Sequence, residues 1–221
     1  MPNWCYNSID IYGESSELQK FVEATKIVGE DGITGYGLSQ LFPIPQELVD
    51  TTSGWHSDPD EQAKQTAKEE ANIAKYGYKD WYDWACDPDN WGTKWGDSDF
   101  DWTNLDSENL KLEPTDVCIS AYYQTAWSPA DGLIRNISAK FPSLTFSVVS
   151  TEESDAFACY SIFRDGKLLA EGGEEPKRPK ELTDENSEDF YDKLNDWQTE
   201  TFDRWSGEAD RALGKILIDN K

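Results

Sequence analysis

Alternating apolar and polar positions predict a half-buried strand at the start of the chain. The alternation runs from Trp4 to Tyr12 and ends at Gly13. A helix follows, because two serines that can cap it precede three apolar residues at helical spacing: Leu18, Phe21 and Val22. A glycine-rich turn then leads to a second predicted strand, about Tyr36 to Phe42. Prolines at positions 43 and 45 end that strand, since proline cannot donate to a ladder.

The second half of the chain repeats this pattern more regularly. It predicts a strand at 117–126, a helix that Ser128-Pro129 caps, a strand at 144–149 and a hairpin of strands 157–164 and 167–170. Asp165-Gly166 is a favoured two-residue hairpin turn. The order of elements predicts the α+β class, with a ferredoxin-like split β-α-β antiparallel sheet that the hairpin extends.

Two further segments complete the predicted domain organisation. The ferredoxin-like domain spans 1–172 and carries an insertion at about 43–116, with a polar helix from Asp58 to Tyr76, a tryptophan-rich segment and a loop-like acidic stretch from Asp97 to Asp116. Residues 173–186 are charged and proline-rich, which predicts a linker or arm. A C-terminal helix at 187–218 places rings at helical spacing, and these would pack onto the domain or onto a second subunit.

The tryptophan-rich segment is the main candidate for a ligand or partner site. Its candidate residues are Trp81, Tyr82, Trp84, Asn90, Trp91, Thr93, Lys94 and Trp95. One interpretation is structural, because indole rings can staple an insertion that has few aliphatic residues. The other is functional, because aromatic faces with a few polar groups can frame a pocket that stacks a base or a sugar.

Four short motifs carry a resemblance to a known family. They are Met-Pro-Asn-Trp-Cys-Tyr-Asn at 1–7, Leu-Phe-Pro-Ile-Pro at 41–45, Trp-Tyr-Asp-Trp at 81–84 and Asn-Trp-Gly-Thr-Lys-Trp at 90–95. Over residues 1–172 the chain resembles the YubB-like proteins, an uncharacterised family of phages and conjugative plasmids with a ferredoxin-like domain. The resemblance implies an accessory protein of a mobile element, in a setting where small acidic proteins often counter host defence. It implies no reaction.

Charge excludes several classes of partner. The chain has 44 acidic and 20 basic residues, for a net charge of −24. Such a field repels nucleic acid and anionic lipid, so we expect no direct nucleic-acid binding and no membrane binding. It favours a protein partner, basic or DNA-handling. The predicted acidic surface consists of Asp87, Asp89, Asp97, Asp99, Asp101, Asp106 and Glu108.

The motifs of common enzymes and metal sites are missing from the sequence. There is no phosphate-binding glycine loop and no zinc-protease motif, and the single histidine, His56, lies in a polar loop. The four cysteines include no C-x-x-C pair. Asp97, Asp99, Asp101 and Glu108 have the spacing of a calcium loop, but Trp102 stands where that loop requires glycine. We therefore expect no metal, no cofactor and no enzymatic activity.

These observations predict a binding protein of the host-cell cytosol (cytoplasmic), since no apolar run of about 20 residues and no secretory signal occurs. The leading hypothesis is an accessory, anti-defence protein that engages a protein partner through an acidic, aromatic surface, in one version by imitating nucleic-acid charge. The alternative is a small-ligand domain that holds a nucleotide or a sugar at the tryptophan-rich segment. The sequence leaves the partner and the oligomeric state open.

Overall fold

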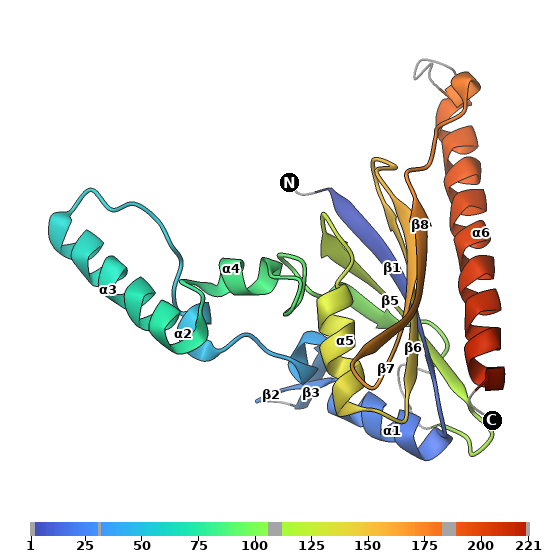
Figure 1. Ribbon diagram of the computed structural model, residues 1–221, viewed down its shortest axis with the longest axis horizontal. Helices are drawn as coiled ribbons and strands as arrows, with labels where there is room; N and C mark the ends of the chain where they lie inside the picture. The colour runs from blue at the N-terminus through green and yellow to red at the C-terminus, as the bar shows by residue number, and fades with distance from the viewer. Residues whose placement is uncertain (1–2, 31, 106–111, 183–188, 220–221) are drawn as a thin grey trace.

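The computed structural model describes residues 3–30, 32–105, 112–182 and 189–219, and it is a mixed α+β fold (Figure 1). The strands are β1 (Trp4–Tyr12), β2 (Lys26–Gly29), β3 (Gly32–Tyr36), β4 (Ser98–Trp102), β5 (Cys118–Ala126), β6 (Thr145–Glu152), β7 (Ala158–Arg164) and β8 (Lys167–Glu174). The helices are α1 (Ser15–Ala24), α2 (Gln46–Val49), α3 (Pro59–Tyr76), α4 (Trp81–Cys86), α5 (Asp131–Lys140) and α6 (Phe190–Asp219), with 3₁₀ turns at Ser39–Leu41 and Lys180–Leu182.

The main sheet confirms the predicted fold class. Its six strands lie in the order β4-β5-β1-β6-β7-β8, and each neighbouring pair is antiparallel. Along the chain, β1, α1 and β4 form one split β-α-β unit, and β5, α5 and β6 form the next. Their strands interleave, which is the ferredoxin-like arrangement. The β7–β8 hairpin then extends the sheet, and its turn residues Asp165 and Gly166 have φ angles of 52° and 71°.

The predicted second strand at 36–42 is wrong. Residues 32–36 belong to a separate two-stranded hairpin, and Ser39–Leu41 form a 3₁₀ turn. The turn buries Leu38 and Leu41, whose spacing of three residues suits a helical turn and would place them on opposite faces of a strand.

The second strand of the ferredoxin-like unit lies instead within the stretch predicted to be an acidic loop. It is β4, which pairs with β5 at the edge of the sheet. The side chains of Phe100 and Trp102 turn toward the core while Asp99 and Asp101 are exposed, so the segment has the period of two that defines a strand. The register shifts along this pair, and Asp99 has a positive φ of 52°.

Asn7 fixes the centre of the sheet. It is fully buried on β1, and its side-chain amide donates to the carbonyl oxygen of Tyr123 and to the hydroxyl of Thr125, both on β5. On the other side its Oδ1 accepts from the hydroxyl of Ser150 on β6 at 2.7 Å. A buried amide needs partners for its polar atoms, so these bonds hold the three strands in one register.

Helices cover both faces of the sheet. α1 and α5 pack on one face, where the predicted helical positions Leu18, Phe21, Leu133 and Ile137 are buried in the core. α5 begins at Asp131, three residues after the predicted cap at Ser128. α6 crosses the opposite face and contacts β6, β7 and β8 (Figure 1). β6 is therefore buried along nearly its whole length on both faces, unlike the alternating β1.

An arm projects from the body between β3 and β4. Figure 1 shows α2 and α3 at its far end and α4 where it joins the rest. α3 confirms the predicted polar helix: Asp58 caps it by accepting from the backbone N–H groups of Asp60 and Glu61, and its only buried residue is Asn72. Asn72 donates to the hydroxyl of Thr51 and to a backbone carbonyl. Polar contacts therefore hold α3, whereas Leu48 of α2 and Trp84 and Ala85 of α4 extend the apolar core into the arm.

Candidate functional site

Part of the tryptophan-rich segment is docked onto the start of α5. Glycine at position 132 permits this, because a Cβ there would lie 2.4 Å from the carbonyl oxygen of Pro88 and 2.5 Å from that of Asn90. Asn136 on α5 donates to the backbone oxygens of Asp89 and Asn90. Ser128, predicted to cap α5, donates instead to the carbonyl oxygen of Gly92.

Three candidate residues of this segment lie in the interior. Trp84 and Trp91 meet edge to face with ring centroids 5.8 Å apart, and the indole N–H of Trp91 donates to the carbonyl oxygen of Phe42 at 2.8 Å. The hydroxyl of Thr93 donates to the carbonyl oxygen of Ala126 at the end of β5. These side chains are 2–8% exposed, and their contacts join the arm to the body.

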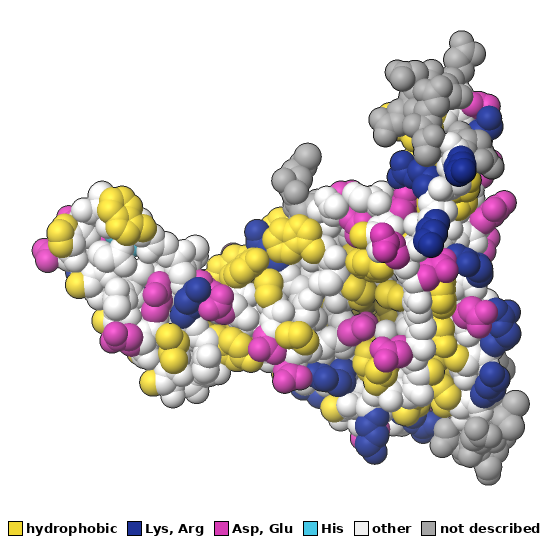
Figure 2. All heavy atoms as spheres, turned by 45° about the horizontal axis from the view of Figure 1, so that its top comes forward, with side chains coloured by type: hydrophobic (Ala, Val, Ile, Leu, Met, Phe, Trp, Pro, Cys, Tyr) yellow, Lys and Arg dark blue, Asp and Glu magenta, His cyan; other side chains and the backbone are white. Residues whose placement is uncertain are grey.

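The other candidate residues remain nearer the surface. Lys94 lies beside three rings, with its Nζ 4.5 Å from the ring centroid of Trp95, 5.7 Å from that of Trp127 and 5.9 Å from that of Tyr82. Tyr82 and Trp127 are exposed, Trp81 is half-buried and packs edge to face on Tyr82, and Asn90 is held by its bond to the carbonyl oxygen of Trp84. Figure 2 shows hydrophobic side chains gathered where the arm joins the body.

The described carboxylates of the predicted acidic surface differ in their surroundings. Asp97 is half-buried and accepts from the backbone N–H of Ser39 at 3.1 Å, and the loss of solvent around its carboxyl raises the pKa of that group. Asp87 accepts from the backbone N–H of Asp89, and Asp89 pairs with Arg135 at 2.9 Å. Asp99 and Asp101 are exposed on the edge strand. Asp106 and Glu108 lie outside the described residues.

No candidate metal site is found in the part of the chain that the structure describes. There, no group of three or more His, Cys, Asp or Glu side chains could hold an ion. Asp97, which holds the first ligand position of the calcium-loop spacing, accepts from the backbone N–H of Ser39. His56 is exposed in the arm.

None of the described helices combines the length and the apolar character needed to cross a bilayer.

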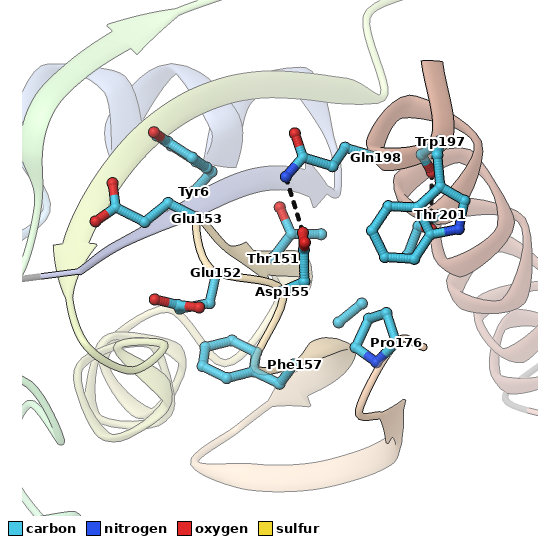
Figure 3. Close-up of a pocket in the computed structure, with 11 residues that line it drawn as sticks. Tyr6, Thr151, Glu152, Glu153, Asp155, Phe157, Pro176, Trp197, Gln198 and Thr201 are labelled. Atoms are coloured by element: carbon cyan, nitrogen blue, oxygen red, sulfur yellow. Dashed lines mark hydrogen bonds between the residues drawn. The ribbon is translucent and has the colours of Figure 1, made fainter. Parts of the chain in front are cut away.

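A groove lies on the other side of the molecule, between the β6–β7 turn and α6 (Figure 3). Its inner part is a cavity of about 150 Å³. The lining residues are Tyr6, Thr151, Glu152, Glu153, Asp155, Phe157, Ala158, Pro176, Trp197, Gln198 and Thr201. An open hollow of about 580 Å³ adjoins it, sharing Pro176, Trp197 and Thr201 and adding Glu174, Lys177, Glu200 and Arg204, of which Arg204 pairs with Glu174. Aromatic walls with a few polar groups are typical of binding sites.

Asp155 ties together the three segments that form the groove. It has a φ of 62°, a left-handed conformation that aspartate tolerates better than most residues. Its Oδ2 accepts from two nitrogens of Arg178, in the segment that follows β8, and the closer nitrogen lies at 2.5 Å. Its Oδ1 accepts from Gln198 of α6 at 2.8 Å. Figure 3 shows Gln198 reaching from α6 toward this aspartate. The side chain of Asp155 is thereby fully engaged.

Two carboxylates next to Asp155 leave negative charge unbalanced at the groove. Glu152 is 4% exposed, and its Oε2 accepts from the backbone N–H groups of Ser154 and Ala156, which closes the turn. Its Oε1 is buried and has no hydrogen-bond partner among the described residues. Glu153 is exposed, and neither glutamate forms an ion pair with a described residue. Burial, and then the charges of Glu153 and Glu152, raise the pKa of Tyr6 in the same groove.

Sequence reasoning missed this groove. Trp197 is one of several rings at helical spacing in the predicted C-terminal helix, and the carboxylates at 152, 153 and 155 are three among the 44 acidic residues of the chain. One local signal existed: the cluster Glu-Glu-Ser-Asp at 152–155 begins three residues after the end of the predicted strand 144–149. Nothing in the sequence indicated that α6 would lie against it.

A match to a protein-family model supports the ferredoxin-like fold. Residues 90–193 match the family model described as "Ferredoxin-like domain in Api92-like protein". The chain is also similar to the crystal structure of a protein api92 from Yersinia pseudotuberculosis, of the family model DUF1281, at 12% identity and a TM-score of 0.45 over 81% of this chain and 100% of that one. No match to a curated protein is found. The YubB-like resemblance stays a prediction, whereas residues 90–193 carry a ferredoxin-like domain similar to that of Api92-like proteins.

Proposed function

We propose that this protein is a non-enzymatic binding protein that takes up a positively charged segment of a protein partner in the groove beside α6. The observation that supports this best is the unbalanced charge of Glu152 and Glu153 next to aromatic walls. A buried carboxylate without a full set of partners is costly. A cation bound above the β6–β7 turn would reduce this cost, so binding and stability would be linked.

The walls of the groove fit a partner better than they fit a solvated counterion. Tyr6, Phe157 and Trp197 are each partly exposed there, and Trp197 borders both the inner cavity and the outer hollow. Aromatic residues in partly desolvated pockets are typical of the positions that carry most of the binding energy in protein interfaces. An extended segment could place a cationic side chain in the inner part, whose lining is acidic, and continue through the outer hollow, where acidic and basic residues are balanced.

The proposal keeps the predicted biological setting and changes the predicted site. The net charge of −24 would steer a basic partner toward the protein and make association sensitive to salt. A DNA-handling protein that acts on a phage or a conjugative plasmid would supply such a segment, which agrees with an accessory or anti-defence role. Imitation of DNA is not needed, because a groove and not a row of carboxylates makes the contact.

The test compares two charge-matched double variants of the full chain. Glu153→Gln with Glu200→Gln removes one exposed carboxylate from each part of the groove. Glu30→Gln with Glu70→Gln removes the same charge from exposed positions in the β2–β3 turn and on α3. The probe is a twelve-residue peptide in which arginine and lysine alternate with glycine and serine, measured by titration calorimetry at low and physiological salt.

We expect the groove variant to weaken binding at least about tenfold, because charge-assisted hydrogen bonds contribute about 1.5–3 kcal/mol each. The control variant should bind nearly as the unmodified protein does, with only the loss that reduced steering predicts. Equal weakening by both variants would show non-specific attraction to an acidic protein and would refute the proposal.

A further inference from the structure

We infer that the inner cavity of the groove binds the guanidinium group of an arginine side chain as the anchor of the bound segment. The inference rests on the proposed function, because it names the chemical group that the groove takes up. It follows from three properties of the cavity: its size, the positions of its hydrogen-bond acceptors and the nature of its walls.

The size of the cavity fits one side chain. At about 150 Å³ it has the volume of a cavity that holds one benzene molecule, so a planar guanidinium with part of its stem can enter. The adjoining hollow is larger and open, and it leaves room for the backbone of the segment to continue along α6. A folded domain could not enter the inner cavity, so a single inserted residue must make the contact.

The acceptors around the cavity are several and come from different segments. Glu153 offers an exposed carboxylate from the β6–β7 turn. The amide nitrogen of Gln198 donates to Asp155, which leaves the carbonyl oxygen of the same side chain as an acceptor. The hydroxyl of Thr201 donates to the carbonyl oxygen of Trp197, so its own oxygen can accept. Five N–H donors in a fixed plane suit such spread acceptors better than the compact ammonium of lysine.

The walls favour the same group. Tyr6, Phe157 and Trp197 present ring surface to a cavity that is only partly open to solvent. A guanidinium is more weakly hydrated than an ammonium and stacks on aromatic faces, so it loses less on entering such a space. The chain already uses this chemistry at the rim, where the guanidinium of Arg178 contacts one oxygen of Asp155 through two nitrogens.

The experiment uses butylguanidinium and butylammonium as probes with the ¹⁵N-labelled full chain. The indole N–H signal of Trp197, assigned through Trp197→Phe, reports the cavity in NMR titrations. We expect butylguanidinium to shift this signal and to bind at least about threefold more tightly than butylammonium. Glu153→Gln should weaken butylguanidinium about tenfold, which corresponds to the loss of one charge-assisted contact, and Glu70→Gln should not. Thr201→Val should weaken butylguanidinium more than butylammonium.

Three results would count against the inference in different ways. Tighter binding of butylammonium at the same signal would overturn the choice of arginine and leave the proposed function intact. No shift of the Trp197 signal by either probe, while the basic peptide still binds through Glu153 and Glu200, would overturn the inner cavity as the anchor site. If neither the probes nor the peptide bind, the inference and the proposed function both fall.

Discussion

Replacing Trp91 by alanine should destabilise the whole fold, because this side chain joins the arm to the core. Trp91 is 8% exposed, its ring packs edge to face on Trp84, and its indole N–H donates to the carbonyl oxygen of Phe42. The substitution therefore creates a cavity between segments that are distant in sequence and leaves the carbonyl group of Phe42 without its donor.

The expected cost follows from these contacts. Truncating a buried tryptophan to alanine costs about 3–5 kcal/mol. This total already includes the aromatic pair and the lost hydrogen bond, so the middle of the range applies. We therefore expect about 4 kcal/mol. For a chain of this size, 1 kcal/mol shifts the melting temperature by about 2–4 °C, so the midpoint should fall by about 8–16 °C.

Chemical denaturation with urea, followed by tryptophan fluorescence and circular dichroism, measures this change. Trp55→Ala is the matched control, because Trp55 is 82% exposed and its loss should change the free energy of unfolding by less than about 0.5 kcal/mol. Trp91→Phe keeps an aromatic ring beside Trp84 and removes the donor to Phe42 together with part of the ring volume. That variant should lose about 1–3 kcal/mol.

A loss below about 1 kcal/mol for Trp91→Ala would refute the reasoning. The same holds if Trp91→Ala and Trp55→Ala change stability equally. An unchanged midpoint together with the loss of a bound nucleotide or sugar would favour the alternative hypothesis, in which the tryptophan-rich segment forms a ligand pocket.

Two further predictions concern a close contact and an acid-sensitive one. Gly132→Ala should destabilise by about 1–3 kcal/mol although alanine favours helices, because its Cβ would collide with the backbone oxygens of Pro88 and Asn90; an unchanged urea midpoint would contradict this. A hydrogen bond from Lys75 lowers the pKa of Glu47 from 4.5 to about 2. The contribution of this contact to the free energy of unfolding is therefore complete above pH 4.5 and disappears as the pH falls through 2. Glu47→Gln should therefore lose less stability over this range than the unmodified protein, and parallel pH profiles would show that the contact contributes nothing.

The sequence alone determined those elements whose signal lies within a few neighbouring residues. The alternation in β1, the cap and first-turn proline of α3 and the Asp165-Gly166 turn each depend on local backbone preferences. The same local signal existed for β4, where Phe100 and Trp102 alternate with two aspartates. The many acidic residues around these two rings favoured the prediction of a loop, although the alternation that is typical of a strand is present in the sequence.

The tertiary structure decided which of these elements meet, because such contacts join residues far apart in sequence. Tyr6, Asp155 and Trp197 line one groove only because β1 lies beside β6 and α6 crosses the same face. The burial of Trp91 depends in the same way on the carbonyl group of Phe42. A sequence pattern specifies which side of an element is apolar, but many packings can bury that side. Shape and hydrogen-bond satisfaction across the whole molecule select one of them.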